Sequence, residues 1–205
     1  MRKISATILS LAAGLLAFNA SAHAAKWGID RVHSSVGFKV SHLVISKVTG
    51  SFSEFDGTIE FDESNLSGGA VEFTVQVASI DTDNEKRDNH LRSADFFDAA
   101  NHPTMTFKST KVSAVEDGKF SITGNLTIRG TTKEVTFDCE YGGSVEAFGG
   151  VRTGFSAQTK INRFDYGLAW DKAIETGGLV VGDEVTILIE LELGKMTEPE
   201  NPCNP

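Results

Sequence analysis

The stretch VEFTVQVASI (residues 71–80) alternates apolar side chains at its odd-numbered positions with mostly polar ones between them. A period of two is typical of a β-strand that buries one face and exposes the other. The alternation resumes at Met105 and Phe107, and similar runs occupy residues 35–42, 48–55, 58–61, 120–128, 135–141, 151–162 and 185–193. About eight such strands predict an all-β protein, because every strand has an apolar face to bury.

The segment DTDNEKRDNHLRSADFFDAANHPTMTF (81–107) interrupts these strands with helical signals. Thr82 and Glu85 have the spacing of a capping box, and the residues that follow are charged and unbranched. A polar helical insertion in a β-protein usually covers a sheet edge or an open end. We therefore expect a short helix near one end of the fold, where an apolar interior meets water.

Turn signals separate several of the strands. Asp56-Gly57, Asp117-Gly118 and Arg129-Gly130 each lie between apolar runs, and Asp-Gly is a strong hairpin signal. Antiparallel strands of this kind form either a sandwich or a closed barrel. Eight strands close into a barrel that holds only side chains or one slim ligand, and periodicity alone favours a core filled with side chains.

The N-terminus has the pattern of a secretory signal peptide, residues 1–24. Arg2 and Lys3 precede an apolar run at 8–18 that is too short to span a bilayer, and small residues suited to cleavage follow at 20–24. We expect one exported, soluble, periplasmic domain at residues 25–194, followed by a proline-rich tail at 195–205. Removal of the signal changes the formal net charge from −9 to −11, which disfavours nucleic acid and anionic membranes as partners.

No specific catalytic motif is present in the sequence. The mature histidines, which are His33, His42, His90 and His102, lack metal-binding spacing, and neither a Gly-x-Ser-x-Gly nor a haem motif occurs. We expect no enzyme activity, no metal and no cofactor. Cys139 continues an apolar strand face and Cys203 lies in the tail, so whether they form a disulfide stays open.

Several separate motifs together resemble the YceI-like family of exported polyisoprenoid-binding proteins. In chain order they are WGIDRVHSSVGFKVSHL (27–43), VTGSFSEFDGTIEFD (48–62), RDNHLRSADFFD (87–98), HPTMTFKST (102–110), GNLTIRGTTKEVTF (124–137) and VRTGFSAQTKINRFDYGL (151–168). The resemblance implies a lipocalin-like, eight-stranded antiparallel barrel whose lumen holds a long-chain isoprenoid, such as a polyprenyl phosphate or a quinone tail. It favours a ligand over a filled core for part of the lumen.

The alternation and the resemblance together predict that eight apolar side chains and one histidine line the lumen. These residues are Phe38, Val40, His42, Phe73, Val75, Met105, Phe107, Phe137 and Phe155. Arg87, His90 and Arg92 are weaker candidates for a head-group site, because the arginine fork suits phosphate. Structural contacts of a solvated helix are the alternative for these three residues, and Arg163 has the same two interpretations.

We expect the protein to carry or store an isoprenoid or other amphiphilic lipid, and a homodimer is left open. Two alternatives remain, namely an enzyme or redox helper that acts on such a lipid, and an interaction domain whose barrel is filled. The absence of nucleophile, metal and cofactor motifs from the sequence favours the carrier.

Export gives a direct test of the N-terminal pattern. Cell fractionation followed by N-terminal sequencing should find the protein in the periplasm, beginning at His23 or Ala25, because signal peptidase cleaves after small-x-small sequences. A cytoplasmic product that retains residues 1–24 would contradict the assignment.

Overall fold

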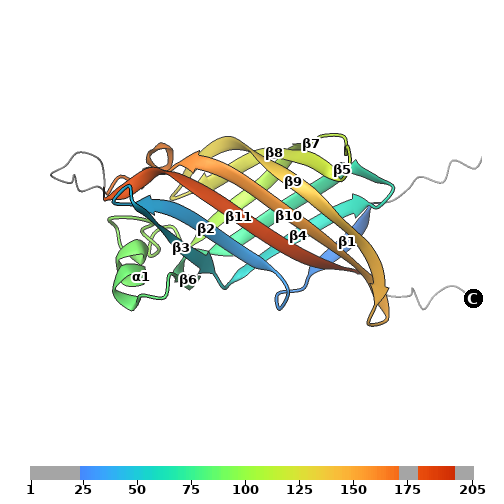
Figure 1. The fold of residues 1–205 in the computed structure, drawn as a ribbon, viewed down its shortest axis with the longest axis horizontal. Coiled ribbons are helices and arrows are strands. Elements are labelled where there is room, and N and C mark those ends of the chain that lie inside the picture. The colour runs from blue at the N-terminus through green and yellow to red at the C-terminus, as the bar shows by residue number, and fades with distance from the viewer. Residues whose placement is uncertain (1–23, 171–179, 197–205) are drawn as a thin grey trace, which may run out of the picture.

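The computed structural model describes residues 24–170 and 180–196, and most of this chain is in antiparallel β-strands (Figure 1). The described strands are β1 (Ala25–Ile29), β2 (Ser35–His42), β3 (Ser46–Phe52), β4 (Phe55–Asp62), β5 (Asn65–Gln76), β6 (Ile80–Asp81), β7 (Thr104–Val112), β8 (Lys119–Ile128), β9 (Thr131–Ala147), β10 (Gly150–Asn162) and β11 (Val181–Lys195). The helix α1 spans Glu85–Arg92, and two 3₁₀ turns occupy Val77–Ser79 and Arg163–Tyr166 (η2). The expected signal peptide and most of the expected tail, including Cys203, lie outside the described residues.

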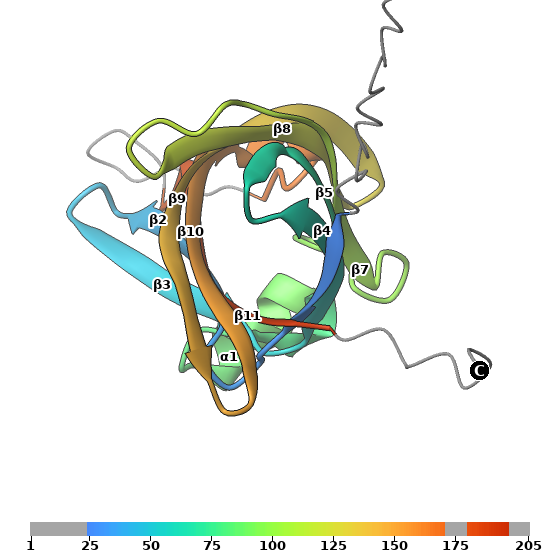
Figure 2. The same cartoon turned by 90° about the vertical axis from the view of Figure 1, so that its right-hand side faces the viewer.

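Eight of these strands close into a barrel. They pair in the order β1-β4-β5-β7-β8-β9-β10-β11, and β11 returns to β1 with Trp27 opposite Lys195 and Ile29 opposite Leu193. The view along the barrel in Figure 2 shows the strands arranged as a ring. The predicted eight-stranded antiparallel barrel with one short helical insertion is therefore confirmed.

The same edge of β11 pairs with two strands. β1 pairs with its C-terminal residues, and β2 pairs with the residues before them. β2 pairs with the N-terminal part of β11, where Phe38 lies opposite Ile187, and β3 and β6 continue the sheet from β2. The break between β1 and β2 is stabilised by Asp30, whose carboxylate accepts hydrogen bonds from the amides of Val32 and His33. An Asp that bonds backbone amides two and three residues ahead favours a turn over a continued strand.

Helix α1 begins two residues later than the capping-box spacing predicts. Its N-cap is Asn84, whose side chain accepts a hydrogen bond from the backbone amide of Arg87. Thr82 is instead buried, and both its amide and its hydroxyl donate to the carboxylate of Asp88. A capping box requires the Thr side chain to reach a backbone amide, and here Asp88 has replaced that partner.

The helix is fastened to one end of the barrel by its arginine side chains. Arg92 donates to the carbonyl oxygens of Ala78 at 2.8 Å and Ile80 at 2.7 Å, at the point where the chain leaves the sheet. Figure 1 places α1 beside β3 and β6, at the end opposite the β9–β10 hairpin. Among the described residues, no helix has the length and apolar character needed to cross a membrane.

The turn predicted at Asp56-Gly57 is wrong, because both residues lie inside β4. A Cβ atom at Gly57 would come within 2.9 Å of the Phe73 ring on the neighbouring strand and 2.6 Å of the Glu72 carbonyl oxygen. The glycine therefore permits close packing of Phe73 against β4. The other two signals are confirmed, since Asp117-Gly118 and Arg129-Gly130 have the paired positive φ angles typical of tight hairpins.

Removal of the Asp88 carboxylate should destabilise the helix attachment. Asp88 is 5 % exposed, and Asp88→Ala leaves two donors of Thr82 without their acceptor. We expect a loss of about 1–3 kcal/mol in the free energy of unfolding, measured by denaturant titration. Lys86→Ala, at an exposed position of the same helix, is the control. Equal stability of the two variants would contradict the role given to Asp88.

Candidate functional site

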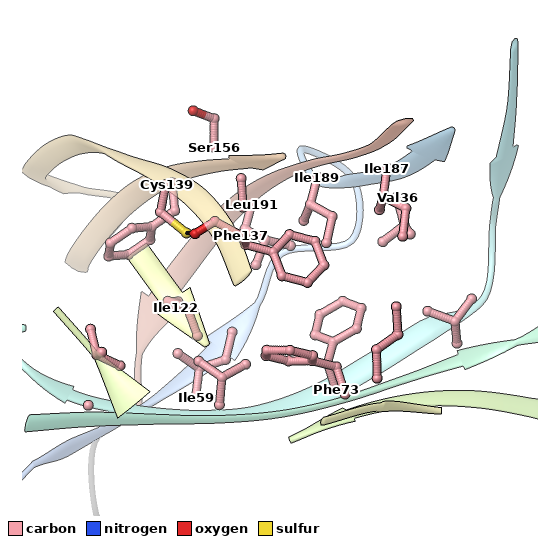
Figure 3. A pocket seen from close by; sticks show the side chains of 18 of the residues that line it. Val36, Ile59, Phe73, Ile122, Phe137, Cys139, Ser156, Ile187, Ile189 and Leu191 are labelled. Atoms are coloured by element: carbon pink, nitrogen blue, oxygen red, sulfur yellow. Dashed lines mark hydrogen bonds between the residues drawn. The ribbon is translucent and has the colours of Figure 1, made fainter. Parts of the chain in front are cut away.

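An apolar cavity lies within the barrel and is lined by inward-facing side chains from nine strands. Figure 3 shows Phe137, Ile189 and Leu191 on one side of it, facing Ile59 and Phe73 on the other. Its wall is almost wholly aliphatic and aromatic, which suits a hydrocarbon ligand.

Six of the nine sequence-predicted lumen residues line this cavity. They are Phe73, Val75, Met105, Phe107, Phe137 and Phe155. The aromatic members pack edge to face, with 5.2 Å between the ring centroids of Phe107 and Phe137 and 5.4 Å between those of Phe61 and Phe155. Whether a ligand contacts these six residues stays a prediction.

The three predicted residues on β2, which are Phe38, Val40 and His42, do not contact the cavity. The ring of Phe38 lies 5.8 Å from that of Phe52 and occupies the space above Gly50, where a Cβ atom would be 2.5 Å from it. Leu91 and Phe97, from the helical segment, pack against the same cluster as Phe38. The insertion therefore fills this end, and the cavity extends along β2 only as far as Val36 and Gly37.

The sequence interpretation also missed part of the wall. Val36, Phe52, Ile59, Phe61, Ile122, Leu126, Ile128, Ile187, Ile189 and Leu191 all line the cavity. Most of them occupy the same alternating runs as the predicted residues. The period-two signal was therefore present for most of these residues, but it does not show which inward-facing side chains border a cavity and which pack against each other.

The volume of the cavity is about 170 Å³. An apolar cavity of about 150 Å³ stays dry and binds benzene, whereas pockets for drug-sized ligands measure about 300–1,000 Å³. The space as it stands holds a fragment of an apolar chain. A longer chain requires wall side chains such as Met105 and Phe155 to change rotamer.

Cys139 is the one thiol of the cavity wall, and its environment makes it inert. Burial raises the pKa of the thiol to about 12, so it stays protonated at neutral pH. A protonated thiol is a poor nucleophile and a poor metal ligand. Cys139 has no disulfide partner among the described residues. Cys203 lies outside them, so the question of their pairing stays open.

The two candidate head-group arginines donate to the protein itself. Arg87 donates from Nε to the Thr82 hydroxyl at 2.7 Å and from a terminal nitrogen to the Thr82 carbonyl oxygen at 2.6 Å. Arg92 makes the carbonyl contacts that hold α1 to the barrel. These bonds match the structural interpretation of both side chains, and a contact with a head group stays a prediction.

His90 and Arg163 also have partners within the protein. His90 Nε2 lies 3.0 Å from a carboxylate oxygen of Asp95, and its ring meets those of Phe96 and Trp170 edge on at 5.1 Å. Arg163 is 2 % exposed and donates to several backbone carbonyl oxygens, namely those of Gly182, Leu168, Trp170 and Val181. His90 therefore connects α1 to the residues around Asp95 and Trp170, and Arg163 connects η2 to the start of β11, both at the helix end of the barrel.

A polar cluster outside the cavity combines Asp30, His33 and Glu192, whose donor atoms lie within 4.8 Å of one another. Hydrogen bonding from His33 lowers the pKa of Asp30, and Arg152 lies 3.8 Å from the same carboxylate. The guanidinium supplies the positive charge that a metal ion would bring. We therefore interpret the cluster as a set of structural contacts that hold the loop between β1 and β2 in place.

Fold and cavity together define a lipocalin-like barrel. The family model described as a YceI-like domain matches residues 27–193, and the chain belongs to the YceI-like family. A UPF0312 protein of Staphylococcus epidermidis is 41 % identical over 162 residues, which cover 78 % of this chain and 92 % of the relative. Protein YceI of Salmonella newport is 40 % identical and covers 88 % of this chain and 92 % of its own length.

Solved structures show the same fold. The crystal structure of Burkholderia cenocepacia BcnA matches with a TM-score of 0.70 at 26 % identity, covering 80 % of this chain and 98 % of its own. The YceI protein of Campylobacter jejuni matches with a TM-score of 0.67 at 36 % identity, covering 82 % and 97 %. A polyisoprenoid binding domain from Saccharophagus degradans has a TM-score of 0.63 at 17 % identity, covering 84 % and 99 %, and this likeness shows the fold alone.

A charge in the cavity wall should be far more damaging than the same charge one residue away. Phe137 is buried in the wall, whereas Thr136 is exposed on the other face of β9. We expect Phe137→Asp to lower the free energy of unfolding by at least about 3 kcal/mol, since it removes a buried ring and introduces an unpaired carboxylate. Thr136→Asp is the matched control, and similar denaturant midpoints for both would show that position 137 does not face an apolar interior.

Proposed function

We propose that the protein binds a long-chain isoprenoid lipid in its barrel and carries or stores it in the periplasm after export. The observation that carries the proposal is the apolar cavity, whose wall is built from the inner faces of nine strands. A wall of aromatic and aliphatic side chains suits a chain of isoprene units better than a polar metabolite. The name of the Saccharophagus degradans domain adds support from a protein of the same fold.

The energetics of the cavity are compatible with tight binding. Burial of one methylene group contributes about 0.8 kcal/mol, so a few isoprene units supply several kcal/mol before the cost of ordering the chain. This gain increases with tail length as far as the wall side chains can move to make room. Recognition of this kind depends on the tail much more than on the head group.

The chemistry of the described wall favours carriage over catalysis. Its thiol is held protonated by burial, and the arginines near the helix end donate to protein oxygens. A protein with this lining can shield a lipid from water without supplying a nucleophile or a proton donor for its conversion. The competing possibility is a barrel that stays filled with its own side chains. The cavity volume of about 170 Å³ is small enough to be compatible with it.

Bound lipid should raise the melting temperature of the protein. A ligand that binds only the folded state stabilises it by RT ln(1 + [L]/Kd), which is about 2.7 kcal/mol at a hundredfold excess over Kd. We expect native mass spectrometry to detect lipid on the purified protein, and delipidated protein to melt lower. Isoprenols of increasing length should progressively restore the melting temperature.

A series of isoprenols and isoprenyl phosphates that share the same tails provides the control. If melting responds to the phosphate and not to tail length, the barrel recognises a head group and the carriage proposal is wrong. If the purified protein contains no lipid and no isoprenoid alters its melting, the filled barrel is the better description.

A further inference from the structure

Tyr166 belongs to a buried apolar cluster that shares residues with the cavity wall. It is the last residue of η2, is 2 % exposed, and packs in a cluster with Leu126, Ile128, Ile161 and Leu168. Leu126 and Ile128 are also part of the cavity wall, so the ring and the cavity share neighbours. Met105 and Phe107, two further residues of the cavity wall, also pack against this cluster.

The hydroxyl of Tyr166 is buried and has no hydrogen-bond partner within residues 24–170 and 180–196. Leaving such a group unpaired costs about 1–3 kcal/mol, and most buried tyrosine hydroxyls do find a partner. Burial raises the pKa of the phenol to about 12, so the group stays a neutral donor at physiological pH. An unpaired donor beside an apolar cavity is suited to a ligand oxygen.

The cationic side chains of this end already hold backbone oxygens. Arg129 donates to the carbonyl oxygens of Gly167 at 2.6 Å and Ala94 at 2.8 Å, in the same manner as Arg87, Arg92 and Arg163. An anionic head group placed here would lose its hydration against an apolar wall. A neutral acceptor avoids that cost, since a carbonyl or hydroxyl oxygen needs only one donor.

Building on the proposed function, on which this inference rests, we propose that the Tyr166 hydroxyl is a hydrogen-bond subsite for a neutral oxygen acceptor of the lipid. The ligand class is a neutral isoprenoid that bears a carbonyl or hydroxyl oxygen, such as a prenylated quinone, held with this oxygen at the η2 end. Met105 belongs to the cavity wall and also packs against the Tyr166 cluster. Its unbranched side chain can move aside to let the oxygen reach the phenol.

The test compares two ligands that differ only in their oxygen atoms. A prenylated benzoquinone and the prenylbenzene with the same tail are titrated into delipidated wild-type protein and Tyr166→Phe. We expect Tyr166→Phe to weaken quinone binding about tenfold, equivalent to 1.4 kcal/mol, and to leave prenylbenzene binding unchanged. In the infrared spectrum, the carbonyl stretch of the bound quinone should lie at lower frequency in the wild type than in Tyr166→Phe.

Tyr141→Phe is the matched control, because the Tyr141 hydroxyl is paired with that of Ser144 at 2.7 Å. It should leave the affinity ratio of the two ligands at the wild-type value. If Tyr166→Phe weakens both ligands equally, or neither, Tyr166 contributes packing alone and the subsite is refuted. If wild-type protein binds neither ligand, the proposed function itself fails, an outcome distinct from the loss of oxygen discrimination. Tighter binding of a prenyl phosphate with the same tail than of the quinone would also overturn the neutral ligand class.

Discussion

The pairing of β1 with β11 is the constraint on which the rest of the structure depends. Three residue pairs, from Trp27–Lys195 to Ile29–Leu193, close the sheet into a ring. Closure removes the sheet edges along this side and encloses the inner faces, so that the apolar wall surrounds a cavity. β11 also pairs with β2, and this double use is made compatible by the turn that Asp30 stabilises between β1 and β2.

Charge and apolar surface have separate places in the barrel. At the helix end, Arg92, Arg129 and Arg163 donate to the backbone carbonyl oxygens of Ala78, Gly167 and Gly182. The interior is left to aliphatic and aromatic side chains, with the protonated Cys139 thiol in the wall and the neutral Tyr166 phenol beside it. Cations thus stabilise the ends of the fold, while recognition in the lumen rests on shape and on neutral groups.

Much of the fold and part of the site were predictable because the alternation of apolar and polar residues along a strand shows which side chains share a face. The alternation correctly indicated that Phe73, Phe107 and Phe137 point inward, and the Asp117-Gly118 hairpin needed only its own turn preference. Phe38, Val40 and His42 on β2 do not line the cavity, and Phe38 packs instead in a cluster that Leu91 and Phe97 of the helical segment also contact. The turn at Asp56-Gly57 was predicted wrongly because the dipeptide alone does not show why the glycine is needed. Here the glycine makes room for the ring of Phe73 on the neighbouring strand, whereas in a hairpin it would permit a positive φ angle.

The sequence by itself determined which residues share a strand face, where the hairpins at Asp117-Gly118 and Arg129-Gly130 turn, and that a polar helical segment interrupts the sheet. Only the tertiary structure decided where the cavity ends, which arginines hold backbone carbonyls, and that the Tyr166 hydroxyl is buried without a partner among the described residues. The physical reason is that a period of two is a property of neighbouring residues. The cavity and its polar contacts depend on ring closure, which joins residues more than 160 positions apart, such as Trp27 and Lys195.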